Sequence, residues 1–565
     1  MKLTGADIVI ETLIEQGVTD VFGYPGGQIL NVYDALYKRS DRINHILTAH
    51  EQGASHAADG YSRATGKVGV VIATSGPGAT NLVTGIATAM LDSIPLVAIT
   101  GNVSCSLIGK DSFQEIDITG VTLPITKHNY FVSDVNELAD VIREAFQIAK
   151  SGRPGPVLID IPKDVQAAVA EYEPAEITPK LPLPKASEEK IREAVALLEN
   201  AKRPFLYIGG GAAGLGMGQE VLALAEKLDA YIGCSFMGLS AISNDCPRFL
   251  GMEGMHGRYS SSVAMKDADC ILAVGVRFSD RATGNVAKFA QSSKIIQLDP
   301  DFSEINKNVR VEIGIVADVE DSFRRIAAAL PEQKHPEWSA LVAGYKADEL
   351  RFESEIEALS GDAITPKKVF DVINTEKPAG TIFATDVGQQ QMWTAQYANF
   401  DRTRRFASSG GLGTMGFGLG AAIGARVASG DTTVLITGDG SFGMNLNEMA
   451  TAARYGIPVI IVLFNNGVLG MVRQWQTLFY EKRYSNTVLD RKTDFVKLAD
   501  AFGLEGYRVS SIDEFREVFR NAVRSNGPVL IEVPIDKDAF VLPMLPPGGS
   551  IDDIIVKKPA IPEEV

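Results

Sequence analysis

The stretch Val434-Leu-Ile-Thr-Gly-Asp-Gly440, followed after 24 residues by Asn465-Asn466, is the most informative part of the chain. A short apolar run rich in β-branched residues precedes each half, which indicates two buried strands of a parallel sheet. Asp439 and Asn466 would therefore lie at carboxyl ends of strands, where α/β folds bind ligands. A carboxylate and an amide oxygen suit Mg²⁺ or Ca²⁺, and the glycines let the backbone approach a diphosphate closely. Ordinary turns use the same residue types, but the paired strands and the spacing favour a metal and phosphate site.

The same alternation of short apolar runs and helical patterns extends over the whole chain and predicts parallel α/β layers. The predicted strands cover residues 20–23, 69–74, 95–100, 156–161, 205–208, 270–276, 294–298, 381–385, 433–437, 459–464 and 529–533. Gly155-Pro-Val-Leu-Ile-Asp-Ile-Pro162 nearly repeats in Gly527-Pro-Val-Leu-Ile-Glu-Val-Pro534. Chance similarity of two buried strands is one explanation. We favour two domains of the same fold on either side of a different middle domain.

Prolines mark the domain boundaries. Four prolines between Glu171 and Ala186 exclude a helix or a central strand there and indicate a semi-rigid linker. The charged stretch from Pro336 to Leu359 predicts a helix, and Thr365-Pro366 predicts the capped start of the next one. The predicted domains are residues 1–172, 187–345 and 365–545, followed by a C-terminal tail at 546–565.

Composition excludes several classes of protein. The 565 residues include 54 Lys and Arg against 70 Asp and Glu, so the formal charge is −16, which argues against a nucleic-acid partner. The long uncharged stretch Phe406–Ala425 is crowded with glycine, so we expect a buried helix and loop instead of a membrane span. The four cysteines form no CxxC pair, and the first residues show no targeting pattern. We expect a cytoplasmic protein with no membrane partner.

Two further motifs follow predicted strands in the first and middle parts of the chain. Glu51 lies in Ala49-His-Glu-Gln-Gly53, directly after an apolar segment, although a glutamate at a helix start is common in any fold. The run Gly209-Gly-Gly-Ala-Ala-Gly214 follows another strand and fits a dinucleotide-binding turn, but no clear acidic partner follows it at the usual distance.

The Gly-Asp-Gly and Asn-Asn pair resembles the motif of thiamine-diphosphate (ThDP) enzymes, in which a pyrimidine-binding and a diphosphate-binding domain of one fold flank a third domain. The resemblance implies an α/β fold with three doubly wound parallel-sheet domains. It also implies a Mg²⁺ ion held by Asp439, Asn466 and the carbonyl of Val468, and Glu51 as the carboxyl group that activates the cofactor. The ThDP-binding residues that it implies are Glu51, Pro77, Asn81, Val387, Gly388, Gln389, Gln390, Gly413, Met415, Gly438, Asp439, Gly440, Ser441, Asn466, Gly470 and Met471.

Segments of the middle domain are similar to the FAD-binding domain of the acetohydroxyacid synthase (acetolactate synthase) family. They are Gly254–Gly257, Gly275–Gly284 and Leu298–Pro300, and other segments fit this family over nearly the whole chain. The resemblance implies an FAD cofactor that takes no obligatory redox part in the main reaction. The implied FAD-binding residues are Arg153, Gly209, Gly210, Gly211, His256, Gly257, Arg277, Asp280, Asp299 and Asp318.

The family reaction decarboxylates pyruvate and joins the hydroxyethyl group to a second 2-ketoacid, which is pyruvate or 2-ketobutyrate. Its products, 2-acetolactate and 2-aceto-2-hydroxybutyrate, belong to branched-chain amino-acid biosynthesis, toward valine and isoleucine. The resemblance implies that Arg281 holds the carboxylate of the second ketoacid and that Trp475 favours 2-ketobutyrate. A neighbouring subunit would supply part of the site, so a homodimer or tetramer is expected, and a small regulatory subunit is left open. The remaining implied catalytic and substrate residues are Gly27, Phe113, Gln114 and Lys163.

The chain departs from the family pattern at three places. Ser279 stands where the family usually has Asp, Gln390 stands where it has His, and residues 102–106 lack the usual proline and arginines. Other ThDP enzymes are the nearest alternatives. Glu51 counts against a glyoxylate carboligase, which lacks that carboxyl group, and Arg281 with Trp475 counts against a pyruvate oxidase. A FAD-free catabolic acetolactate synthase and an inactive ThDP-fold binding protein are the remaining alternatives.

Overall fold

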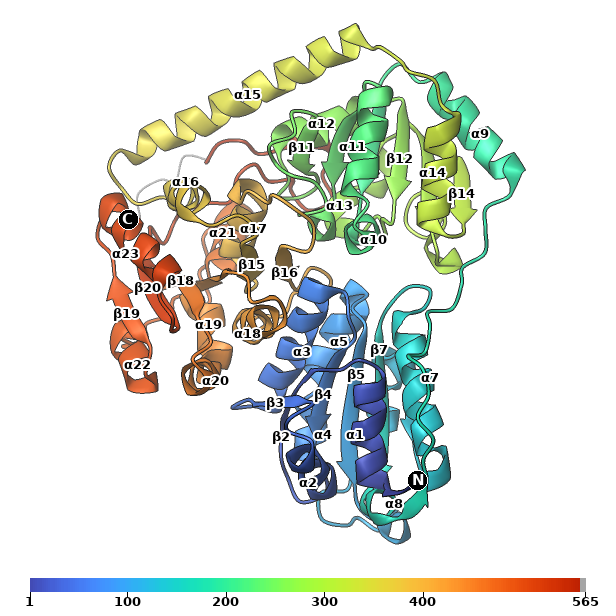
Figure 1. Ribbon diagram of the computed structural model, residues 1–565. Coiled ribbons are helices and arrows are strands. Elements are labelled where there is room, and N and C mark those ends of the chain that lie inside the picture. The colour runs from blue at the N-terminus through green and yellow to red at the C-terminus, as the bar shows by residue number, and fades with distance from the viewer. Residues whose placement is uncertain (559–565) are drawn as a thin grey trace.

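A six-stranded parallel sheet forms the centre of each of three α/β units in the computed structural model, which describes residues 1–558 (Figure 1). The first sheet has the order β3-β2-β4-β5-β7-β6, and every pairing in it is parallel. Its strands are β2 (Asp20–Tyr24), β3 (Asn44–Leu47), β4 (Gly69–Ala73), β5 (Leu96–Asn102), β6 (His128–Phe131) and β7 (Pro156–Pro162). The short strands β1 (Lys2–Thr4) and β8 (Val169–Glu171) form a separate antiparallel pair.

Helices cover both faces of the first sheet. Val70 and Ile72 of β4 belong to the core under α1 and α7, whereas Val71 and Ala73 belong to the core under α3 and α5. Successive residues of a strand point to opposite faces, so a strand buried on both sides is apolar throughout. The helices of this unit are α1 (Gly5–Glu15), α2 (Leu30–Lys38), α3 (Glu51–Thr65), α4 (Pro77–Thr80), α5 (Val83–Asp92), α6 (Ile118–Thr122), α7 (Leu138–Lys150) and α8 (Lys163–Ala167).

The third sheet repeats the strand order of the first, as β16-β15-β17-β18-β20-β19. Its strands are β15 (Ile382–Thr385), β16 (Phe406–Ser408), β17 (Thr433–Gly438), β18 (Val459–Asn465), β19 (Glu505–Arg508) and β20 (Val529–Pro534). The nearly repeated segments form β7 and β20, which each hold the fifth place in their sheet. The prediction of two domains of one fold is therefore confirmed. The helices are α16 (Pro366–Glu376), α17 (Gln389–Tyr397), α18 (Gly418–Ser429), α19 (Asp439–Asn445), α20 (Met449–Tyr455), α21 (Gly470–Phe479), α22 (Phe495–Phe502) and α23 (Ile512–Arg524).

The central sheet has a different order, β11-β10-β9-β12-β13-β14, which is that of dinucleotide-binding doubly wound folds. Its strands are β9 (Pro204–Ile208), β10 (Tyr231–Cys234), β11 (Phe249–Met252), β12 (Cys270–Val274), β13 (Lys294–Asp299) and β14 (Ile313–Val316). Its helices are α9 (Glu188–Glu199), α10 (Gly210–Leu215), α11 (Gly218–Lys227), α12 (Tyr259–Asp267), α13 (Asp280–Thr283), α14 (Val319–Ala329) and α15 (Pro336–Ser360). Figure 1 shows α15 running from the central unit toward the third.

The predicted linker and the two predicted helices near the boundaries are present in the structure. The domain boundaries themselves stay predictions, and the predicted end of the middle domain, residue 345, falls inside α15. No helix or strand lies between β8 and α9, and α15 ends at Ser360 with Gly361 as its C-cap residue. Thr365 caps α16 by accepting the amide hydrogen of Lys368 at 3.2 Å. The prediction of only helix and loop at 406–425 was wrong for its first three residues, which form the edge strand β16. Part of the predicted tail, residues 559–565, lies outside the described residues.

Glycines bring the first and third units into close contact. α3 packs against α18, where a Cβ on Gly60 would lie 2.1 Å from the carbonyl oxygen of Ala421 and one on Gly424 would lie 1.8 Å from that of Ala57. Only glycine allows backbones to approach so closely. This packing explains why the part of the glycine-rich stretch that forms α18 carries Gly420 and Gly424, both of which face α3. No helix within residues 1–558 is both long and apolar enough to cross a membrane.

Candidate functional site

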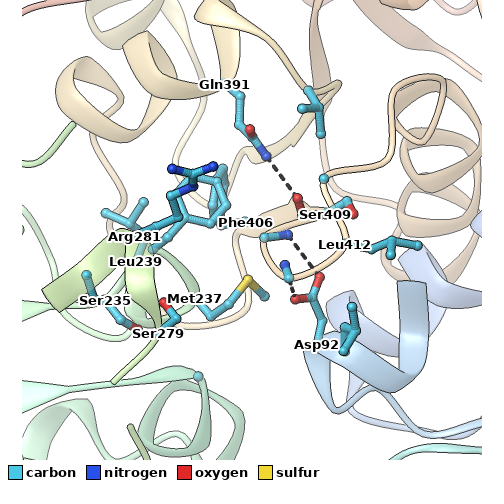
Figure 2. Close-up of a pocket in the computed structure, with 18 of the residues that line it drawn as sticks. Asp92, Ser235, Met237, Leu239, Ser279, Arg281, Gln391, Phe406, Ser409 and Leu412 are labelled. Atoms are coloured by element: carbon cyan, nitrogen blue, oxygen red, sulfur yellow. Dashed lines mark hydrogen bonds between the residues drawn. The ribbon is translucent and has the colours of Figure 1, made fainter. Parts of the chain in front are cut away.

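A cavity of about 1770 Å³ lies where the three units meet. The third unit contributes the turns after β15, β16, β17 and β18, and the central unit contributes the turns after β9, β10, β11 and β12. Ligands bind beyond the carboxyl ends of parallel strands in such folds, because loops of several strands converge there. Figure 2 shows Ser235, Met237 and Arg281 from the central unit facing Gln391 and Ser409 from the third. The cavity lining includes these predicted site residues: Arg153, Gly210, Gly211, His256, Arg277, Asp280, Arg281, Asp299, Asp318, Val387, Gly388, Gln389, Gln390, Gly413, Met415, Gly438, Asp439, Gly440, Ser441, Asn466, Val468, Gly470, Met471 and Trp475.

Asp439 and Asn466 lie next to each other in this cavity. Strands β17 and β18 pair through Gly438 and Phe464, so the turns that follow them are adjacent. Burial raises the pKa of Asp439 to about 6, although hydrogen bonds from the backbone amides of Asn466 and Gly467 act in the opposite direction. The buried carboxylate, an amide oxygen and nearby carbonyls form a hard oxygen donor set that fits Mg²⁺. Within residues 1–558 no cluster of three or more His, Cys, Asp or Glu side chains offers an alternative metal site.

Gln390 occupies the place where the family usually has histidine, and it has a defined partner. Its side-chain amide donates to the Ser441 hydroxyl at 3.1 Å, directly beside the Gly-Asp-Gly turn. Next to it, a Cβ on Gly470 would lie 2.0 Å from Oε1 of Gln389, so a larger residue there would displace the Gln389 side chain. The neutral amide thus contacts the Gly-Asp-Gly turn without adding a charge beside Asp439.

The central unit supplies the second half of the cavity. A Cβ on Gly209 would lie 2.1 Å from the carbonyl oxygen of Gly275, so the turns after β9 and β12 touch at a position that only glycine fits. Gly209 and Gly257 lie behind the lining, beside residues that do line it. Nδ1 of His256 is buried and has no hydrogen-bond partner among the described residues. A buried polar atom without a partner is costly, so this half of the cavity fits a ligand with hydrogen-bonding groups, as FAD has.

Arg153 comes from the first unit and reaches the central half of the cavity. Its Nη1 donates to Glu304 at 2.7 Å and its Nε donates to the Ser93 hydroxyl at 2.8 Å. The side chain therefore bridges two units at the edge of the predicted FAD site.

Arg281 and Trp475 come from different units but lie together. The Arg281 guanidinium lies 5.7 Å from the centre of the Trp475 ring, and its side chain is 63% exposed. The cation–π contact with the ring helps to hold the guanidinium, whose Nη1 also donates to the Met255 sulfur at 3.5 Å and whose Nε lies 3.8 Å from Asp280. A guanidinium has five N–H donors, so the group can still bind a carboxylate. The pair has the chemistry that a ketoacid subsite needs.

The other predicted residues of the first unit do not line the cavity. Glu51 begins α3, and Oε2 of its carboxylate accepts a hydrogen bond from Nδ2 of Asn81 at 2.9 Å. Lys163 donates to the carbonyl of Gly27 at 3.0 Å, and Phe113 is 84% exposed. The residues in this group are Gly27, Glu51, Pro77, Asn81, Phe113, Gln114 and Lys163. Within one chain the structure thus separates the predicted activating carboxylate from the predicted metal ligands.

Sequence reasoning missed polar residues in the cavity wall. Arg63 and Asp92 of the first unit and Tyr207 and Glu253 of the central unit all line the cavity. Both carboxylate oxygens of Glu253 lack a hydrogen-bond partner in the described part of the chain, and burial raises the pKa of this residue to about 8. None of the four lies in a motif, so only their spatial position identifies them.

Comparisons with known proteins match each of the three units to a known domain. Residues 3–121, 191–326 and 386–533 match the N-terminal TPP binding domain, the central domain and the C-terminal TPP binding domain of thiamine pyrophosphate enzymes. The chain is 45% identical to the acetolactate synthase isozyme 2 large subunit of Escherichia coli, over 98% of this chain and all of the relative. It is also 45% identical to a probable acetolactate synthase large subunit of Methanocaldococcus jannaschii (99% and 98% covered) and 44% identical to the acetolactate synthase large subunit of Corynebacterium glutamicum (98% and 90%). The chain therefore belongs to the acetolactate synthase family of thiamine pyrophosphate enzymes.

Proposed function

We propose that the protein decarboxylates pyruvate with ThDP and transfers the two-carbon unit to a second 2-ketoacid. Pyruvate as acceptor gives 2-acetolactate, and 2-ketobutyrate gives 2-aceto-2-hydroxybutyrate, which are intermediates on the routes to valine and isoleucine. The observation that carries this proposal is the single cavity that brings Asp439 and Asn466 together with Arg281 and Trp475. Relatives that are named acetolactate synthase large subunits and that match nearly the full chain support the same reaction.

ThDP supplies a nucleophilic carbon and an electron sink for the loss of CO₂. Asp439, Asn466 and the carbonyl of Val468 would hold a Mg²⁺ ion that binds its diphosphate. Gly438 and Gly440 leave room for the phosphate oxygens because they carry no side chain. The Arg281 guanidinium would bind the ketoacid carboxylate, and the apolar face of Trp475 would contact the extra methyl group of 2-ketobutyrate.

A second copy of the chain would complete each site. Glu51, Gln114 and Lys163 do not line the cavity of their own chain, so we propose that they enter the cavity of a partner in a homodimer, or in a tetramer made of two such dimers. Glu51 would then share a proton with the aminopyrimidine ring, and Gln114 and Lys163 would face the substrate. Because relatives are named large subunits, we also propose a small regulatory partner.

FAD would bind in the central half of the cavity, against the turns at Gly210 and Arg277 and beside His256. Its support is the strand order of the central sheet and the unpartnered polar atoms at the cavity wall. In the family this cofactor takes no obligatory redox part, so we assign it a structural role. The cytoplasmic location stays a prediction.

The direct test incubates purified protein with pyruvate, ThDP, Mg²⁺ and FAD and measures acetolactate. Leaving out each cofactor in turn should abolish or reduce product formation. A preparation that binds flavin and consumes oxygen without forming acetolactate would contradict the proposal and indicate a pyruvate oxidase. Adding 2-ketobutyrate should divert product to 2-aceto-2-hydroxybutyrate.

A further inference from the structure

Asp92 connects the first unit to the cavity through two backbone hydrogen bonds. It is the last residue of α5, and its carboxylate accepts the amide hydrogens of Gly410 at 3.0 Å and Gly411 at 2.7 Å, in the loop after β16 (Figure 2). Its side chain is fully buried and lines the cavity. A carboxylate from one unit thus holds the main chain of another, and nothing in the predicted motifs accounts for it.

A buried ion-pair network holds Asp92 in place. Arg63 donates to Asp92 at 2.9 Å and to Asp59 at 2.5 Å, and the Arg63 side chain is 4% exposed. Burial alone would lower the pKa of Arg63, but the two carboxylates raise it, so the guanidinium stays charged. The guanidinium also lies 5.3 Å from the ring centre of Phe417 in the third unit. Because buried ion pairs need several partners in good geometry, this network fixes the Asp92 carboxylate in one position.

The loop that Asp92 holds separates the two halves of the cavity. Residues 409–413 and Met415 line the cavity wall. On one side a Cβ on Gly410 would lie 2.5 Å from the sulfur of Met237 in the central unit. On the other side a Cβ on Gly440 would lie 3.9 Å from the terminal carbon of Met415, beside Asp439. One loop therefore contacts both halves.

Thr88 holds the same loop from the first unit at a second point. Its hydroxyl lies 2.7 Å from that of Thr414, and the amide of Thr414 donates to the Ser409 hydroxyl at 3.0 Å. The loop itself contains Gly410, Gly411 and Gly413, and glycine loses more conformational freedom on ordering than any other residue. A loop of this composition needs outside contacts to keep one conformation.

We propose that Asp92 is a positioning residue for both halves of the cavity. Its hydrogen bonds to the amides of Gly410 and Gly411 order the loop at residues 409–415 before either cofactor binds. The proposal rests on the assignment of ThDP and FAD to the two halves. An ordered loop spares each cofactor the entropy of ordering it, so binding is tighter. Loss of these hydrogen bonds should therefore weaken the binding of both cofactors together, although Asp92 belongs to neither predicted set of ligands.

The test compares D92N with the matched control D269N in the full chain. Asp269 also accepts two successive backbone amides, those of Lys202 and Arg203 at 2.9 Å, but it does not line the cavity. The dissociation constants of ThDP and FAD are measured by fluorescence titration of the apoprotein, together with the melting temperature of each variant. In D92N both constants should rise about tenfold, because one acceptor for a backbone amide is lost and the Arg63 pairing is weakened. In D269N both constants should stay at the wild-type value, even where the melting temperature falls equally.

A second variant covers the case in which D92N fails to fold. T88V removes the hydroxyl contact to Thr414 with little change of shape. The dissociation constants of both cofactors should rise, as in D92N, but by a smaller factor. Steady-state kinetics of either variant should show a raised KM for ThDP with kcat nearly restored at saturation. Unchanged constants in D92N and T88V, or equal losses in D269N, would overturn the proposal. Because binding is measured without turnover, a wild-type protein that binds both cofactors but forms no acetolactate contradicts the proposed function alone, and one that binds neither contradicts both.

Discussion

Strands β7 and β20 have nearly the same sequence and the same place in their sheets, yet they accommodate a buried acid differently. Asp160 on β7 accepts hydrogen bonds from the Thr100 hydroxyl at 2.7 Å and from Nδ2 of Asn102 at 2.5 Å. Burial raises the pKa of Asp160 to about 7, although these two bonds lower it. Glu532 on β20 instead pairs with Arg508 at 2.9 Å. The shared fold depends on the apolar residues of these strands, which are nearly the same in both. The partners of the buried acid differ between the two units because they come from other strands.

The same difference extends to the strand ends, where the chemistry lies. In the third unit the turns after β17 and β18 carry Asp439 and Asn466, whereas in the first unit the turn after β3 carries Glu51. A fold supports many functions because loops change while the buried strands stay the same. Two units of the same fold thus carry two different parts of one predicted site: the metal ligands in the third unit and the activating carboxylate in the first.

The largest expected effect is the loss of turnover in two variants, one in the first unit and one in the third, which should differ in cofactor affinity. E51Q and D439N should each reduce turnover about thousandfold, because one removes a proton-transferring carboxyl group and the other a metal ligand. ThDP and Mg²⁺ affinity should fall only in D439N. Steady-state kinetics and fluorescence titration of both variants check this. Equal loss of cofactor affinity in E51Q would contradict the division between the units.

The next effect tests the two buried acids. Asp160 has a pKa of about 7 in the folded state and about 3.8 in the unfolded state, so the folded state keeps the proton up to a higher pH. The stability that this proton binding contributes is complete below about pH 4 and is lost as the pH rises from about 4 to 7. The stability of the wild type relative to D160N should fall by up to about 4 kcal/mol over that range. Urea unfolding of both proteins at several pH values measures it.

E532Q is the matched control for this experiment. Its stability relative to the wild type should change much less over the same pH range, since Glu532 forms an ion pair with Arg508 at 2.9 Å, whereas Asp160 is buried with neutral partners. A difference between the wild type and D160N that does not change with pH would show that Asp160 has the same pKa in the folded and unfolded states, which would contradict the raised pKa.

A smaller effect concerns a helix that the third unit has and the first lacks. α21 follows β18 and carries Trp475, whereas the equivalent strand β5 is followed by turns and short helices. W475L should lower the preference for 2-ketobutyrate over pyruvate about tenfold, because one methyl contact is worth only a few kcal/mol. A competition assay with both acceptors measures the product ratio. An unchanged ratio would remove Trp475 from the specificity model.

The smallest effect tests whether the two units of different chains cooperate. Mixing E51Q and D439N subunits should restore about a quarter of wild-type activity, since random dimerisation gives half heterodimers with one intact site of two. Coexpression followed by activity assay measures this. No recovery in verified heterodimers would show that each chain uses its own Glu51 and Asp439.

Much of the fold could be predicted from sequence because the central strands are buried on both faces. β4, β12, β17 and β18 are continuous apolar runs, and each was predicted within a few residues. Edge strands such as β6 and β19 were missed, because their partly exposed residues show no continuous apolar pattern. A strand with one open edge depends on its neighbour more than on its own sequence.

The cavity shows the same limit. Asp439, Asn466 and the glycine turns stand in motifs with fixed spacing, so sequence alone identified them and the fold of the units that carry them. Asp92, Tyr207 and Glu253 are isolated in sequence and become cavity residues only when three units meet. Glu51 and Asp439 were already expected in separate domains, but only the tertiary structure shows that Glu51 does not line the cavity of its own chain. The reason is that a sequence pattern reflects contacts over a few residues, whereas the packing of whole units depends on contacts hundreds of residues apart.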